Sequence, residues 1–230
     1  MMEPVVIYES DQLVVVDKPA GMLTHPTHRN EDNTLVAWLL SVYPDMAGVG
    51  EDVTRPGIVH RLDGATSGLL VVARTPEAYE RLKQLFQERE VVKKYWALVW
   101  GVPKEDHGVI EKDITAHGGK RRTVEVYSQL PPGKARAATT AWRKERAYQD
   151  CALLDVAPTT GRTHQIRVHV ASMGHPIVCD TLYGAKRACP PELGCMFLHS
   201  YFLRIPFSST ELLEFEIPLP KELEAYLEAL

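Results

Sequence analysis

Hydrophobic and polar residues along this 230-residue chain follow two different periods, which predict both helices and strands. Three segments carry apolar residues three or four positions apart, the spacing of one helical face. They are 33–44, 75–90 and 163–174, and a short acidic helix is expected at 220–230. The segment 75–90 has the clearest signals, because Thr75 can cap the first turn and Pro76 can occupy that turn without losing a hydrogen bond.

Strands are expected where apolar residues alternate or form short runs between turn residues. Two lie within 4–19 around an Asp-containing turn, and the others are 58–62, 69–73, 93–101, 138–145 and 151–158. Strands and helices are interspersed without a regular βαβ rhythm, which favours an α+β fold with a mixed or antiparallel sheet. Without an internal repeat or a long linker, one domain over residues 1–230 is the simplest expectation.

Composition indicates a soluble, cytoplasmic protein. Hydrophobic residues make up 45% of the chain, enough for a sizeable core, but no apolar stretch approaches the length of a membrane span. The N-terminus has no signal-type segment. The four cysteines form no C-x-x-C pair, so reduced thiols without disulfides are expected. They are Cys151, Cys179, Cys189 and Cys195.

Charge is distributed unevenly along the chain. The net charge is -4, yet residues 117–146 contain eight Lys/Arg and two Glu, or +6, and the last twenty residues contain six Glu and one Lys, or -5. Such segregation allows a locally positive face on an acidic protein. The alternative is a solvated basic loop without a partner. Gly and Pro cluster at 116–120 and 130–133, which are expected to be the most mobile segments.

Arg61 and Asp63 form the first candidate site. If 58–62 continues as a strand, both side chains point to the same face. An ordinary strand-end ion pair is the alternative. The small residues Thr66, Ser67 and Gly68 follow at once, and they would let a ligand approach the backbone closely. This combination favours a ligand site over a core.

The second candidate site lies in 159–169. Gly161 and Arg162 precede a predicted helix, whose N-terminus favours an anion. His164 and Arg167 recur at helical spacing. A surface helix with polar decoration is the alternative interpretation.

Several other chemistries lack support. Cys189, Cys195 and His199 match no common zinc spacing, so no metal is predicted. The sequence contains no P-loop and no glycine-rich dinucleotide fingerprint. A hydrolase remains possible by composition, although the G-x-S-x-G elbow is missing.

The sequence "HRLDGATSG" (60–68) resembles the H-R-L-D-x-x-T-S-G signature of RNA pseudouridine synthases similar to ribosomal large subunit pseudouridine synthase A. Four further motifs of that family occur in the same order. They are "VDKPAGMLTHP" (16–26), "KKYWALVWG" (93–101), "TGRTHQIRVH" (160–169) and "GHPIVCDTLYG" (174–184). The resemblance covers most of the chain.

This resemblance implies a single α+β catalytic domain, built on a bisected mixed, mainly antiparallel sheet flanked by helices and loops. It implies that uridine in RNA becomes pseudouridine without a cofactor. The expected partner is structured RNA, an rRNA or tRNA stem-loop, and neither a membrane nor an obligate protein partner is implied. The N-terminal accessory RNA-binding domain of many relatives is expected to be absent.

The resemblance also assigns roles to residues. Asp63 would be the catalytic carboxylate, acting either as nucleophile at C1′ or as base at the 2′ carbon. Arg162 would pair with Asp63 and keep it ionised. Arg61 would fill the space left by the flipped base, Tyr95 would pack on that base, and Leu198 would contact the target uracil.

Seven further motif residues are expected to contact the substrate. They are His60, Thr66, Ser67, Gly68, His164, Gln165 and Arg167. The chain departs from the family pattern at Val16-Asp17, where asparagine is more common before the lysine, and at Cys179, where glycine is common. A non-catalytic RNA-binding module on the same scaffold is the alternative function.

Overall fold

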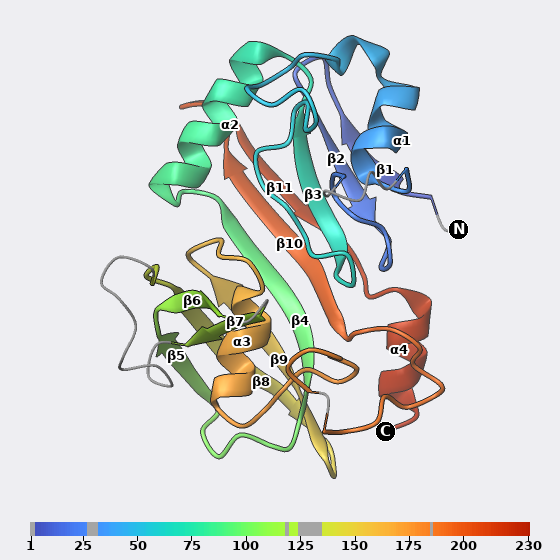
Figure 1. The fold of residues 1–230 in the computed structure, drawn as a ribbon, viewed down its shortest axis with the longest axis vertical. Helices are drawn as coiled ribbons and strands as arrows, with labels where there is room; N and C mark the ends of the chain where they lie inside the picture. Colours follow the sequence, from blue (N-terminus) through green and yellow to red (C-terminus); the bar gives the residue numbers. More distant parts are fainter. Residues whose placement is uncertain (1–2, 27–31, 118–119, 124–134, 185) are drawn as a thin grey trace. The chain divides into compact units, whose positions relative to one another are not determined.

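The structure, a computed structural model, describes residues 3–26, 32–117, 120–123, 135–184 and 186–230. The chain forms two compact units, one of Met1–Val92 with Ser200–Ile217 and one of Lys93–His199 with Pro218–Leu230. Each unit combines a sheet with helices, which confirms the predicted α+β class (Figure 1). No helix in the described part of the chain is both long and apolar enough to traverse a lipid bilayer.

The sheet of the first unit has the strand order β1-β2-β3-β10, and β11 pairs with β10. Its strands are β1 (Val5–Glu9), β2 (Leu13–Lys18), β3 (Ser67–Ala73), β10 (Leu198–Pro206), which enters this unit at Ser200, and β11 (Leu212–Glu216). The β1/β2, β2/β3 and β10/β11 pairings are antiparallel. The hydrophobic pattern predicted β1, β2 and β3 but neither β10 nor β11.

Two helices of the first unit begin where the sequence predicted. In α1 (Leu35–Val42) the Thr34 side chain accepts a hydrogen bond from the Ala37 N–H, and in α2 (Pro76–Glu88) Thr75 does the same for Ala78. These caps satisfy donors that the first helical turn would otherwise leave unpaired. A short 3₁₀ helix, η1 (Pro44–Met46), follows α1.

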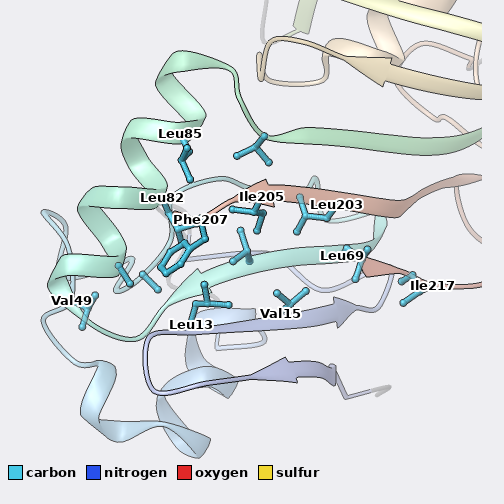
Figure 2. Close-up of a cluster of buried hydrophobic side chains, with 14 residues drawn as sticks. Leu13, Val15, Val49, Leu69, Leu82, Leu85, Leu203, Ile205, Phe207 and Ile217 are labelled. Atoms are coloured by element: carbon cyan, nitrogen blue, oxygen red, sulfur yellow. The ribbon is translucent and has the colours of Figure 1, made fainter. Parts of the chain in front are cut away.

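A cluster of fourteen buried apolar residues holds the first unit together. Figure 2 shows Leu82 of α2 next to Phe207, while Leu69 and Leu203 of the same cluster lie farther along their strands. Each fully buried Leu contributes roughly 1.5–3 kcal/mol through removal of its surface from water. This core anchors β3, the strand that follows Asp63.

The sheet of the second unit has the order β4-β9-β8-β5, and its pairings are antiparallel. Its strands are β4 (Val92–Trp100), β5 (His107–Glu111), β8 (Thr139–Ala147) and β9 (Cys151–Pro158). A separate hairpin joins β6 (Ile114–His117) to β7 (Lys120–Thr123). The predicted strands 93–101, 138–145 and 151–158 are confirmed.

The described residues of the second unit form two helices, α3 (Gln165–Ser172) and α4 (Lys221–Glu228). Both were predicted. Ile114 of β6 packs with Val168 of α3 in a small apolar cluster, while Leu223 of α4 joins a second cluster around Leu98 and Phe197. Of the two segments expected to be mobile, 116–120 partly forms the β6–β7 hairpin. Residues 118–119 and 130–133 lie outside the described residues.

The expectation of four reduced cysteines was wrong. Cys179 and Cys189 form a disulfide with their Cα atoms 4.5 Å apart, whereas Cys151 and Cys195 are free. The chain turns back after Cys179, where the Gly184 N–H donates to the Asp180 carbonyl, and this turn brings the two sulfurs together. Their spacing in sequence gives no sign of it. Cys179 has a φ of 63°, a left-handed conformation that suits the glycine common at this position.

Gly68 makes a demanding contact with the neighbouring strand. Its φ is 114°, and a Cβ atom there would lie 2.3 Å from the Ser200 carbonyl oxygen. Gly174 also has a positive φ, 86°, but a Cβ at that position would meet nothing within 4 Å. Gly68 therefore serves the β3/β10 packing, and the expectation that it leaves space for a ligand gains no support.

This contrast predicts unequal effects of alanine at the two glycines. Gly174→Ala should destabilise the protein by about 1–2 kcal/mol, the cost of a left-handed residue. Gly68→Ala adds a backbone clash and should cost on the order of 3–5 kcal/mol. Urea unfolding followed by circular dichroism measures both. Equal costs for the two variants would contradict the packing role of Gly68.

Candidate active site

The segment that carries Asp63 is irregular. Residues 59–66 form bends and a turn, so the prediction of a strand at 58–62 is wrong. The one described β-bridge of this segment joins Ile58 to Val72. The Asp63 carbonyl accepts a hydrogen bond from the Thr66 N–H at 3.0 Å, which closes a turn directly before β3. Strand alternation therefore does not orient Arg61 and Asp63. The turn and its neighbours do.

Lys18 is the neighbour that fixes this turn. Its side chain is fully buried at the end of β2, and its ammonium donates to the carbonyls of Pro19 (2.9 Å), Met22 (2.8 Å) and Gly64 (3.5 Å). The Gly21 N–H also donates to the Gly64 carbonyl, at 2.7 Å. The Lys18 ammonium and the Gly21 N–H therefore both hold the carbonyl of Gly64, the residue that follows Asp63.

Asp63 also acts on Lys18 through its charge. Burial lowers the pKa of Lys18 to about 7, although the nearby Asp63 and, more weakly, Asp17 raise it. A buried ammonium is costly unless carbonyls and a carboxylate compensate it, as they do here. The motif containing Lys18 was recognised in the sequence, but this role was missed, because burial of a lysine is not visible in a sequence.

Arg61 is exposed and contacts His25, with 3.2 Å between its Nη1 and the histidine Nε2. An arginine can only donate, so His25 Nε2 must be the acceptor and the ring must be neutral with its proton on Nδ1. Burial, together with the charges of Arg61 and Arg55, lowers the pKa of His25 to about 4. This histidine therefore remains an acceptor for Arg61 at physiological pH.

The remaining predicted residues of the first unit are mostly held by the protein itself. The His60 ring stacks on Phe86 with centroids 4.5 Å apart, and its Nε2 accepts the Val71 N–H at 3.0 Å. Thr66 and Ser67 are buried. His60 thus has structural partners, and Thr66 and Ser67 are covered by the protein; contact of these three residues with RNA stays a prediction.

In the second unit, Gln165 organises the turn that precedes α3. Its amide donates to the Thr139 carbonyl and to Thr140 Oγ1, and its carbonyl accepts from Thr160 Oγ1 and from the Arg162 N–H. All four bonds are between 2.7 and 3.0 Å. A buried amide with every donor and acceptor satisfied fixes the backbone of this turn rigidly.

Arg167 and Asp180 form a buried, forked ion pair. Arg167 Nε donates to Asp180 Oδ2 at 2.8 Å and Nη2 donates to Oδ1 at 2.9 Å, while the guanidinium carbon lies 5.3 Å from the centre of the Tyr183 ring. Burial alone would raise the pKa of Asp180, but the hydrogen bonds and charge of Arg167 outweigh it and lower this pKa. His164 joins this group, since its Nδ1 lies 3.0 Å from the Tyr183 hydroxyl.

Arg162 lies in a different environment, a cavity of about 360 Å³ on the second unit. Its Nε donates to the Ala137 carbonyl at 3.1 Å. Among the residues that the structure describes, eight line the cavity: Ile114, Thr115, Ala116, Arg121, Arg136, Gly161, Arg162 and Thr163. The two arginines on this short segment thus differ sharply, because Arg167 is buried and held by a carboxylate, whereas Arg162 faces a polar cavity.

Tyr95 and Leu198 are both buried, on β4 and at the start of β10. Tyr95 lies opposite Val156 in the β4/β9 pairing. Two residues earlier on β4, burial lowers the pKa of Lys93 to about 8. Lys93 was part of a recognised motif, but its shifted pKa was not predicted.

The predicted site residues therefore fall into two groups. Asp63, Arg61 and the residues around them lie in the first unit, together with Lys18 and His25. Arg162, Tyr95, Leu198 and the helix α3 residues lie in the second. The expected pairing of Asp63 with Arg162 stays a prediction.

Comparison with known proteins agrees with these motifs. The family model for RNA pseudouridylate synthase matches residues 12–172. The chain is 38% identical over 224 residues to an uncharacterized RNA pseudouridine synthase of Synechocystis, covering 96% of this chain and 67% of the relative. It is also 38% identical over 232 residues to ribosomal large subunit pseudouridine synthase D of Nitrosomonas europaea, covering 98% of this chain and 64% of the relative. The chain thus spans about two thirds of the length of these relatives.

Solved structures show the same likeness. Human RNA pseudouridylate synthase domain containing 4 matches with a TM-score of 0.77 and 25% identity, covering 97% of this chain and 92% of that one. Human RNA pseudouridylate synthase domain containing 1 matches with a TM-score of 0.75 and 28% identity, covering 97% and 87%. From the family match over most of its length, this chain belongs to the RNA pseudouridine synthase family.

Proposed function

We propose that this chain converts uridine to pseudouridine in RNA, with Asp63 as the catalytic carboxylate. The observation that carries the proposal is the turn of Asp63, tied to Lys18 through Gly64 and close enough for the carboxylate charge to act on the lysine. The charge of Asp63 raises the pKa of Lys18 against the effect of burial, so the two groups interact. A carboxylate can serve either as a nucleophile or as a base.

The reaction is an isomerisation, so its atoms balance within the substrate. The bond from N1 to C1′ breaks, a bond from C5 to C1′ forms, C5 loses its proton and N1 gains one. Asp63 would act at C1′ as nucleophile or at the 2′ carbon as base. Tyr95 would pack on the uracil and receive the C5 proton, and Leu198 would contact the same ring. No cofactor takes part in this scheme.

The target base must leave its stack before Asp63 can reach the sugar. Arg61 is suited to occupy the vacated space, because its side chain is exposed and is oriented by a neutral acceptor, His25. Structured rRNA is the favoured substrate class, since the Nitrosomonas relative is named as a ribosomal large subunit enzyme. A tRNA stem-loop is the alternative substrate.

The motif assigns Arg162 as the partner of Asp63, and this assignment is part of the proposal. Its side chain faces a cavity and is not held by a carboxylate of the second unit in any described contact. Arg167 is a different case, because its Nε and Nη2 are already committed to Asp180.

The first test removes the charge of the catalytic carboxylate. Asp63→Asn should bind RNA as wild type does but lower the rate of isomerisation by at least about 10²-fold, since the group that attacks or abstracts is lost. Tritium release from RNA containing 5-tritiated uridine measures the rate. Asp45→Asn, an exposed carboxylate of the same unit, is the control. RNA binding without tritium release by the wild type would instead indicate a non-catalytic module.

The second test reads the charge of Asp63 at Lys18. Asp63→Asn should lower the pKa of Lys18 below about 7, because the larger of the two stabilising charges is removed, and Asp17→Asn should lower it less. The pKa of Lys18 is 10.5 in the unfolded chain and about 7 in the folded protein. Between these two pH values the unfolded state binds more protons than the folded state, so the free energy of unfolding rises with pH there. NMR titration of the lysine ε-carbon measures the shift. If Lys18 had the same pKa in Asp63→Asn as in the wild type, the Asp63 carboxylate would have no electrostatic effect on this lysine.

The third test separates the two arginines by kinetics. Arg162→Lys keeps the positive charge but loses the planar fork, and should lower kcat by about 10²-fold with little change in KM. Arg167→Lys keeps a charge beside Asp180 and is the matched control, which should mainly lower the stability of the fold. Lysine is used because alanine at 167 would leave Asp180 buried and unpaired, at a cost of about 3–5 kcal/mol. A kcat effect confined to Arg167→Lys would contradict the role of Arg162.

A further inference from the structure

The Cys179–Cys189 disulfide of the second unit has one exposed partner. Cys189 is exposed, whereas Cys179 is half-buried and packs against the apolar cluster that contains Phe197. The free cysteines differ from this pair, because Cys151 is buried, Cys195 is half-buried, and burial raises the pKa of both thiols. Protonated thiols are poor nucleophiles. The disulfide is therefore the cysteine group that a reagent in solution can reach, and exposed disulfides are the ones that thiols reduce most readily.

Tyr183, in the turn that follows Cys179, links two other elements. Its hydroxyl accepts the Arg121 N–H of β7 at 3.1 Å and lies 3.0 Å from Nδ1 of His164, the N-cap residue of α3. Its own N–H donates to the Asp180 carboxylate at 3.1 Å, so this turn sets the position of the tyrosine. The turn after Cys179 thereby holds the β6–β7 hairpin and the start of α3 together.

The segment that leads to Cys189 lies on the surface, since residues 186–189 are all exposed. The Arg187 N–H donates to the Gly184 carbonyl at 3.0 Å, and the Arg187 guanidinium carbon lies 5.1 Å from the centre of the Trp100 ring. A single hydrogen bond and a cation–π contact at an exposed site are both weak. The disulfide is thus the strongest of the described links between this segment and the buried chain.

Cys179 has a backbone conformation that suits glycine better. Its φ is 63°, in the left-handed region, which is disfavoured for every residue that has a side chain. Such a conformation persists when surrounding contacts hold it in place. The bond to Cys189 is one such contact, and glycine, the residue common at this position in the family, could not form it. Without this bond, the left-handed backbone of Cys179 favours rearrangement of the turn.

We propose that the Cys179–Cys189 pair is a reversible redox site, which a dithiol reduces in the folded protein. Reduction releases the segment 186–189, loosens the turn around Tyr183 and lowers the rate at which the protein modifies RNA. The effect on this rate rests on the proposed function, whereas the redox site itself does not.

The reduction is a thiol–disulfide exchange in two steps. One thiolate of the dithiol attacks the sulfur of Cys189, the bond between the two cysteines breaks, and Cys179 leaves as a thiolate that takes up a proton. The second thiolate of the dithiol then attacks the mixed disulfide and releases Cys189, which also takes up a proton. The cysteine pair gains two electrons and two protons, and the dithiol loses them and becomes a cyclic disulfide.

The first experiment counts thiols. The folded wild type is incubated with or without dithiothreitol as the dithiol, which is then removed, and the protein is unfolded, labelled with N-ethylmaleimide and weighed by mass spectrometry. Two cysteines should be labelled without dithiothreitol and all four after it, with no change in the circular dichroism of the folded protein. Four labels without dithiothreitol, or reduction that requires a denaturant, would overturn the redox site.

The second experiment measures cleavage by trypsin after Arg187, once dithiothreitol has been removed under argon. Reduced wild type should be cleaved at least about tenfold faster than oxidised wild type, because cleavage follows the population of the open segment. Cys195→Ser, which removes a free thiol of the same unit, is the control and should keep this difference. Equal rates for oxidised and reduced wild type would contradict the release of this segment.

Two single variants separate the crosslink from the backbone conformation. Cys179→Gly and Cys189→Ser both lose the disulfide, but only glycine also removes the cost of the left-handed residue. Cys189→Ser should therefore be cleaved about tenfold faster than Cys179→Gly, and dithiothreitol should change neither rate. Equal rates for the two variants would contradict the part assigned to the Cys179 backbone.

Tritium release from RNA containing 5-tritiated uridine then tests the effect on activity. The rate should fall when the wild type is reduced and should not respond to dithiothreitol in Cys179→Gly. If oxidised and reduced wild type are equally active, the link between this site and activity is overturned. If the oxidised wild type releases no tritium, the proposed function fails, while the thiol counts and cleavage rates still decide the redox site.

Discussion

The buried ammonium of Lys18 is the interaction on which the candidate active site depends. It ends β2, donates to the carbonyls of Pro19, Met22 and Gly64, and draws the turn of Asp63 toward the neighbouring loop. The charge of Asp63 raises the pKa of this lysine, which burial lowers. A carboxylate on a turn fixed in this way is suited to act as nucleophile or base.

The second unit uses the same principle with different groups. A buried carboxylate, Asp180, orients Arg167 by a fork, and a buried amide, Gln165, fixes the turn that presents Arg162. The two arginines therefore have different surroundings although they are five residues apart. Arg167 stabilises the second unit through its fork to Asp180, whereas Arg162 faces the cavity.

The sequence predicted much of this fold because local signals were strong. The cap at Thr75 and the alternating strands are local features, and they lie where expected. The prediction of a strand at 58–62 failed because tertiary contacts hold this segment: the Thr24 hydroxyl donates to the Leu62 carbonyl, and the His60 ring accepts the Val71 N–H. The Cys179–Cys189 disulfide, burial of Lys18 and the different surroundings of the two arginines arise from segments that meet only after folding, so spacing could not reveal them.

The most direct test of the account is a map of pseudouridine across total RNA from cells that produce either the wild-type protein or Asp63→Asn, in a strain lacking the endogenous gene. The account predicts a small set of uridines in structured RNA that carry the modification only with the wild-type protein. Identical maps from the two strains would contradict the role of Asp63 and the proposed activity together.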